Sequence, residues 1–295
     1  PLLFLIYIND LAFVSKHLRS IIFADDTNVF ISGKNICELE SIMNQELQLL
    51  REWLMANKLS LNINKTHFML FCPRNKKCTD VIKLQIDNTN ISEVSSTKFL
   101  GVTIDNKITW KQHINITSQK ISKCLGIIHK SKKVLSTKPL LMLYNSFVLP
   151  HFMYCISLWG NSCTTTLAPL IKLQKRAIRC ICNKSKWSSA SELLKQHNLL
   201  KLQDIYSYSV LMFLYKFYNK DLPDIFSDYF VYNTEVHRYN TRQANKIHIP
   251  KYSTNLGKEY VKYSGALLFN RFIDVVNFTC KIGAFKKKIK IELLK

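Results

Sequence analysis

Residues 21–31 place two adjacent carboxylates, Asp25 and Asp26, between two short runs of β-branched and aromatic residues. Such runs predict strands, and the Ala-Asp-Asp-Thr-Asn segment between them is typical of a turn, so the stretch predicts a β-hairpin. Neighbouring carboxylates repel each other unless water or a cation screens them. Mg²⁺ is a natural partner, because it binds one or two carboxylates together with substrate phosphates. From these residues alone a solvated turn without metal is the alternative, since Asp is common in turns.

Four sequence blocks connect this hairpin to a known family. Phe23-Ala24-Asp25-Asp26 resembles the (F/Y)xDD signature of reverse transcriptases, in the form frequent in non-LTR retrotransposons of the jockey and related types. In the same order as in that family, residues 1–11 resemble the GPLLFxxYINDL segment, residues 53–66 the W…NxLxLNxxKT block and residues 98–113 the KFLGVxID…LxWxxHI block. The order and spacing of the four blocks make the resemblance specific. It covers nearly the whole chain, with the motifs concentrated in residues 1–113.

The resemblance implies an RNA-directed DNA polymerase, a nucleotidyltransferase that adds dNTPs to a DNA primer on an RNA template by two-metal catalysis with Mg²⁺. It makes Asp25 the main metal ligand of the hairpin and Asp26 a weaker neighbour, and it places Lys65 near the incoming triphosphate. It also implies a turn that holds the primer, formed by Phe99, Leu100 and Gly101. On the residues alone, the alternative for Lys65 is a solvated turn lysine, and residues 99–101 are equally well an ordinary strand end.

One Asp pair cannot hold two metal ions, so a further carboxylate from another strand is needed. The family places that acid on an earlier palm strand, which we expect to lie before Pro1. The chain is therefore expected to be a C-terminal fragment that begins inside the palm and is inactive alone. The alternative is a catalytically dead nucleic-acid-binding remnant of a retroelement. A phosphoacceptor domain is a third possibility, which the charge and the missing βα repeat disfavour.

A formal net charge of +22 calls for a polyanionic partner. Nucleic acid ranks ahead of an anionic membrane surface, because no basic amphipathic stretch has an aromatic membrane face. No run of about 18 uncharged apolar residues predicts a membrane span. A basic stripe that could follow a phosphate backbone consists of Lys172, Lys175, Arg176 and Arg179, although such a stripe is more often only a solvated helix face.

The pattern along the chain predicts an α+β fold. A helix is expected within residues 1–14 and another from an Asn35 cap to about residue 57. Short strands are expected at residues 59–63, 67–72, 81–86, 91–94 and 99–104. From about Lys111 the pattern is helical, with a helix from Leu140 that Pro150 should stop or kink and a second capping residue at Ser189.

These elements predict three parts: a partial palm of antiparallel sheet with packed helices (residues 1–112), a helical thumb-like region (113–183) and a basic helical extension (184–295). The nine cysteines form no CxxC pair, so neither a zinc ribbon nor a redox motif is indicated, and free thiols are expected. We expect an intracellular protein, in the nucleus or cytoplasm, that is not secreted.

Overall fold

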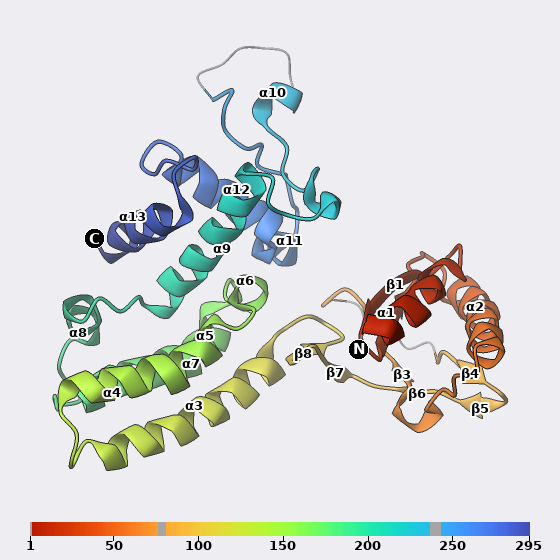
Figure 1. The fold of residues 1–295 in the computed structure, drawn as a ribbon, viewed down its shortest axis with the longest axis horizontal. Helices are drawn as coiled ribbons and strands as arrows, with labels where there is room; N and C mark the ends of the chain where they lie inside the picture. Colours follow the sequence, from red (N-terminus) through yellow and green to blue (C-terminus); the bar gives the residue numbers. More distant parts are fainter. Residues whose placement is uncertain (1, 76–80, 237–242) are drawn as a thin grey trace. The chain divides into compact units, whose positions relative to one another are not determined.

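The computed structural model describes residues 2–75, 81–236 and 243–295 (Figure 1). The chain divides into two compact units, Pro1–Ile108 and Thr109–Lys295. The first combines helices with short strand pairs and the second is mainly helical, so the α+β class is confirmed. The functional division at residues 112/113 and 183/184 stays a prediction. Within the described residues, no helix is both long and apolar enough to cross a membrane.

The first unit is built around one hairpin and one long helix. The chain begins with α1 (Leu2–Ile8) and the 3₁₀ turn η1 (Asn9–Phe13), followed by β1 (Arg19–Phe23), β2 (Asp26–Phe30) and α2 (Ile36–Ala56). Asn35 caps α2 as predicted, because its side-chain oxygen accepts a hydrogen bond from the Cys37 amide. The buried core of this unit consists of Ile8, Leu11, Leu18, Leu47, Leu50, Leu84, Ile86 and Ile91.

The remaining strands of the first unit are shorter than the sequence predicts. They follow the 3₁₀ turn η2 (Ile63–Lys65) and are β3 (His67–Phe68), β4 (Gln85–Ile86), β5 (Thr89–Asn90), β6 (Ser92–Glu93), β7 (Ser96–Phe99) and β8 (Val102–Asp105). Four separate two-stranded ladders result, and β3 with β6 is parallel while the other three are antiparallel. The strand pairing of the first unit is thus mainly antiparallel, as predicted, and is divided among separate small ladders in the described residues.

Two strand predictions are wrong, and in both places residues with positive φ explain why. The predicted strand at residues 99–104 is a hairpin, because Leu100 and Gly101 have φ of 44° and 84° and reverse the chain. The predicted strand at residues 59–63 is absent, because Lys58 leaves α2 with φ of 54° and the following residues run irregularly into η2. Asp87 and Asn88 likewise have positive φ, and they form the two-residue turn between β4 and β5.

The second unit contains α3 (Lys111–Ser131), α4 (Thr137–Leu143), the π turn η3 (Tyr144–Val148), α5 (Leu149–Met153), α6 (Ile156–Trp159), α7 (Thr164–Ile181), α8 (Ala190–Gln196) and α9 (Leu202–Tyr218). After the 3₁₀ turn η4 (Asp224–Phe226) come α10 (Asn233–Val236), α11 (Asn255–Glu259), α12 (Val261–Phe272) and α13 (Ile282–Leu294). Helices α3, α4 and α7 pack side by side, and α9 packs against α12 and α13 (Figure 1).

Pro150 does not stop the helix that passes it. The chain remains helical to Met153, because a π turn closed by a hydrogen bond from the Leu149 amide to the Tyr144 carbonyl precedes the proline. Proline has no amide hydrogen and its ring clashes with the carbonyl four residues earlier in a regular helix. The wider π turn changes that spacing. The buried side chains of this segment are Leu140, Tyr144, Val148 and Phe152.

The cysteines differ from expectation at one position. Cys72 is disulfide-bonded, so the expectation of free thiols is wrong there. Among the described residues seven other cysteines are free, at positions 37, 124, 155, 163, 180, 182 and 280, and Cys78 lies outside the described residues.

Candidate active site

The Asp pair lies at the tip of the β1–β2 hairpin, as the sequence predicts. Phe23 pairs with Asp26 in the last rung, so Ala24 and Asp25 form a two-residue turn. Ala24 has φ of 52°, the left-handed region that disfavours a residue with a Cβ atom. A positive φ at the first turn position is typical of a type II′ turn, where glycine is usual. Strained residues of this kind cost about 1–3 kcal/mol and cluster at functional sites.

The two faces of this hairpin have different environments. Ile22 and Val29 pack against the core of the first unit. The opposite face presents Ile21, Phe23 and Phe30, with exposed fractions of 49%, 60% and 41%. Asp26 lies on this exposed face, because residues directly opposite in a ladder share a face and Asp26 is opposite Phe23. The carboxylate of Asp26 thus lies beside the exposed ring of Phe23, on a face that also carries the exposed Arg19.

Both carboxylates are accessible. Asp25 and Asp26 are exposed, and no described residue forms an ion pair or hydrogen bond with either side chain. The described residues contain no group of three or more His, Cys, Asp or Glu that could hold a metal ion. Two exposed carboxylates fit the one or two that Mg²⁺ takes from a protein. The donor atoms of the hairpin are therefore of the kind that Mg²⁺ binds in proteins.

Lys65 ends the 3₁₀ turn η2, is exposed, and is separated from β3 by Thr66. The turn is closed by hydrogen bonds from the amide and the hydroxyl of Thr66 to the Asn62 carbonyl, at 3.1 and 3.0 Å. Residues 60–64 and Thr89 line an open hollow of about 630 Å³ beside it. Within the described residues, no hydrogen bond or ion pair joins Lys65 to Asp25 or Asp26.

His67 is a residue that the sequence interpretation missed. Its Nδ1 lies 3.1 Å from the Lys65 carbonyl oxygen, and its Nε2 lies 2.6 Å from the Thr97 hydroxyl on β7. A carbonyl only accepts, so Nδ1 carries the hydrogen, and in the neutral ring Nε2 accepts from Thr97. The imidazole therefore joins the Lys65 turn to the β7–β8 hairpin. The parallel β3–β6 pairing and a hydrogen bond from the Val94 amide to the Phe68 carbonyl bring these segments together, and such long-range contacts leave no sign in the periodicity.

The residues predicted to hold the primer form the tip of the β7–β8 hairpin. Phe99 pairs with Val102, which is buried, and Leu100 and Gly101 make the turn. Positive φ at both turn residues is typical of a type I′ turn, which favours Asn-Gly. Gly101 adopts this conformation without strain, whereas Leu100 does so at a cost.

The basic stripe lies on α7, and its four members differ. Lys172, Lys175 and Arg176 are exposed on the side of α7 opposite the buried Leu170, Gln174 and Ile178. Arg179 is half-buried, and its Nε donates a 2.8 Å hydrogen bond to the Ser188 carbonyl. Arg179 thus holds a loop, while the other three cations form no ion pair with any residue that the structure describes.

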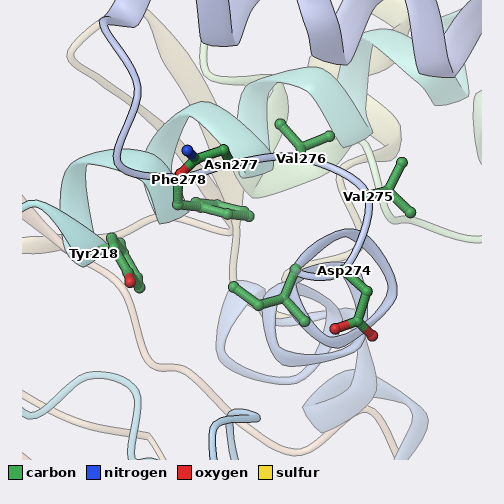
Figure 2. Close-up of a pocket in the computed structure, with 7 residues that line it drawn as sticks. Tyr218, Asp274, Val275, Val276, Asn277 and Phe278 are labelled. Carbon is green, nitrogen blue, oxygen red and sulfur yellow. The ribbon is translucent and has the colours of Figure 1, made fainter.

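A second hollow was not predicted from the sequence. Tyr218 and residues 273–278 line an open depression of about 380 Å³ in the second unit (Figure 2). Asp274 is the only charged residue among them, and Asn219 holds the segment by a 3.0 Å hydrogen bond to the Phe278 carbonyl. The depression contains no group of catalytic side chains.

Part of the chain is similar to known proteins. Residues 1–104 match the family model described as "Reverse transcriptase (RNA-dependent DNA polymerase)". The chain is 24% identical over 186 residues to the RNA-directed DNA polymerase from mobile element jockey of Drosophila melanogaster, which covers 62% of this chain and 20% of that protein. It is 24% identical over 217 residues to the probable RNA-directed DNA polymerase from transposon X-element of the same species, covering 70% and 23%. A third relative, the retrovirus-related Pol polyprotein from type-1 retrotransposable element R1 2 of Nasonia vitripennis, is 26% identical over 149 residues, covering 46% and 35%.

The chain spans about a fifth of the length of the jockey and X-element relatives that it matches. No solved structure matches it.

Proposed function

Because this chain is homologous to the reverse transcriptases of non-LTR retrotransposons, we propose that it is the part of an RNA-directed DNA polymerase that contains the second half of the palm and the helices after it. The observation that carries the proposal is the exposed Asp25-Asp26 pair at the tip of the β1–β2 hairpin, where Ala24 has a positive φ, within the matched residues. The substrates would be dNTPs, a DNA primer and an RNA template.

In this proposal Asp25 and Asp26 supply the carboxylates of a two-metal site. Mg²⁺, when bound, would lower the pKa of the primer hydroxyl and neutralise charge on the triphosphate. Asp25, in the turn, is the principal ligand, and Asp26 approaches from the exposed face of β2. One further carboxylate from another palm strand is required.

The exposed apolar face of the hairpin supports the need for such a strand. Ile21, Phe23 and Phe30 are large apolar side chains that stay between 41% and 60% exposed on this face. An isolated two-stranded hairpin is marginally stable in water, and a third strand would bury these rings and complete the metal site together.

Lys65 would act on the other end of the triphosphate. An exposed ammonium without an ion pair in the described part of the chain is available to stabilise the charge that develops on pyrophosphate. His67 would be a positioning residue, since it fixes the Lys65 carbonyl and the β7–β8 hairpin in one network. Gly101, which lacks a Cβ atom, would let the primer backbone approach that hairpin closely.

Primer extension tests the proposal. The assay uses a polymerase completed by joining this chain to a carboxylate-bearing palm strand, with an RNA template and a labelled DNA primer, and compares Asp25→Asn with Asp228→Asn. Asp228 is an exposed carboxylate of the second unit, so the control makes the same chemical change away from the hairpin. Extension that survives only in the control supports the polymerase. A wild-type protein that binds primer–template but never extends it would instead be the nucleic-acid-binding remnant.

A further inference from the structure

Trp187 stands apart from the other tryptophans of the chain. Its side chain is 83% exposed, whereas Trp110 and Trp159 are buried at 8% and 0% and Trp53 packs against the core of the first unit. A single exposed apolar side chain needs no explanation by itself. Two further features indicate a binding role for Trp187: the turn that presents it and the positive charges around it.

The turn is rigidly supported. Lys186 and Trp187 are the central residues of a β-turn in which the Ser188 amide donates to the Ser185 carbonyl at 3.2 Å. The Arg179 guanidinium holds the Ser188 carbonyl from α7, and Ser189 caps α8 by accepting from the Glu192 amide at 3.4 Å. Helix α8 is in turn buried against α7, where Ala190, Leu193 and Leu194 cluster with Ile178. The indole is thus displayed on a turn that is already ordered, so little conformational entropy is lost when a ligand binds to it.

The surroundings are strongly cationic. Residues 164–198 contain seven Lys or Arg and a single acid, Glu192. The Lys186 ammonium lies 4.9 Å from the centre of the Trp187 ring. In the described part of the chain, no ion pair occupies Lys184, Lys186 or the three exposed cations of α7. An exposed aromatic ring beside unpaired cations complements an anionic ligand with flat apolar faces.

We propose that the Trp187 turn is a stacking platform for an unpaired base of single-stranded nucleic acid, with the turn and α7 cations along its phosphates. This inference rests on the proposed function and names the form of nucleic acid that this surface takes. Exposed aromatic rings bind single strands because every base has a π face that is free when the strand is unpaired. In a duplex the same faces are covered by neighbouring base pairs. A protein partner is disfavoured, because serines and lysines surround Trp187 instead of an apolar patch.

The test measures binding of the full chain to fluorescently labelled oligo(dT) and to an abasic oligomer of equal length and charge. Trp187→Ala should weaken oligo(dT) binding about 5- to 150-fold, the range of one lost base–aromatic stack. It should leave abasic-oligomer and duplex binding nearly unchanged, and Trp187→Phe should restore most of the loss. The control is Val134→Ala, an 87% exposed side chain next to Lys132 and Lys133 that has no aromatic face.

Salt dependence separates the ring from the cations. Trp187→Ala should lower affinity at every salt concentration without changing the slope of log K against log salt. Lys186→Ala should reduce that slope by about 0.7, the contribution of one phosphate contact on a single strand. Oligo(dT) should also quench the indole emission of the wild type more than that of Trp187→Phe.

The inference is overturned if Trp187→Ala binds oligo(dT) like the wild type, or if it loses oligo(dT) and the abasic oligomer equally. Unchanged thermal unfolding of the variant confirms that its fold is intact. Failure of the polymerase proposal is distinguishable: primer extension would be absent from the completed enzyme while Trp187-dependent binding of oligo(dT) persists.

Discussion

Phe23 and Asp26 face each other across the last rung of the β1–β2 hairpin, and both lie on its exposed face. The pairing leaves Ala24 and Asp25 as the whole turn. Asp25 therefore extends from the tip, while Asp26 is fixed by the ladder beside a phenyl ring. The side chain of Asp25 is thus freer to reach a metal ion than that of Asp26. We therefore expect substitutions of the two residues to affect activity to different extents.

In the completed polymerase, Asp25→Asn should abolish primer extension, and Asp26→Asn should weaken it less. The amide keeps the size of the side chain and removes the charge that binds the metal. Loss of one well-placed electrostatic group costs on the order of 10²–10³ in rate, and a direct metal ligand should cost more. Near-normal extension by Asp25→Asn would show that this hairpin is not the metal site.

Lys65→Ala should lower the turnover of the completed polymerase and leave template binding almost unchanged. The ammonium is expected to act on the leaving group, so its loss affects the transition state more than the bound state. Single-turnover extension and binding at matched salt separate the two effects. Lys98→Ala is the control, because Lys98 is an exposed lysine on the neighbouring β7. Equal loss of affinity and turnover in Lys65→Ala would make Lys65 a simple phosphate contact.

His67→Phe should reduce extension in the same manner as Lys65→Ala, without removing any charge that touches substrate. Phenylalanine keeps the ring but breaks the bonds to the Lys65 carbonyl and the Thr97 hydroxyl. A double-mutant cycle with Thr97→Val measures the coupling, which should be about 0.5–1.5 kcal/mol for one hydrogen bond. Additive effects of the two substitutions on turnover would remove His67 from the network.

The 295-residue chain should bind nucleic acid without extending a primer. Its formal net charge of +22 predicts an affinity that falls steeply with salt, with nearly one unit of log–log slope for each phosphate neutralised on duplex DNA. Binding should be largely independent of sequence, because phosphate contacts carry no base information. Filter binding between about 50 and 200 mM salt measures the slope. A flat profile, or dNTP incorporation by this chain alone, would contradict the prediction.

The second unit should lose stability in mild acid. Burial, reinforced by the positive charge of Lys120, lowers the pKa of His113, whose ring lies 5.6 Å from that of Trp159. The unfolded chain therefore binds the proton more readily than the folded one, and the free energy of unfolding decreases as pH falls below about 6.5. His151 has a lowered pKa for the same causes and adds to the effect.

Thermal unfolding between pH 7.5 and 5 checks this, and His113→Phe should flatten the profile. An unchanged pH dependence in the variant would assign the effect to other groups.

Elements that depend on residues close together in the sequence were predicted correctly. The hairpin around Asp25 and the caps at Asn35 and Ser189 depend on neighbouring residues, and the structure has all three. The strands after α2 were predicted poorly, because a two-residue turn such as Leu100-Gly101 interrupts an apolar run without a change in composition. The roles of His67 and Arg179 depend on partners that lie far along the chain or in a loop, and alternation of residue types contains no information about them.

The buried side chains of α4, the π turn η3 and α5 recur with a spacing that a regular α-helix would not keep on one face. Leu140, Tyr144, Val148 and Phe152 recur every four residues and are all buried. In a regular α-helix each four-residue step advances the side chain about 40° past a full turn, so the fourth member would point about 120° away from the first. The π turn absorbs part of that drift and keeps the four side chains aligned on one core. A strict four-residue repeat of large apolar residues ahead of a proline is thus a readable sign of a π turn, and deleting one residue within 144–148 would rotate everything after it away from the core.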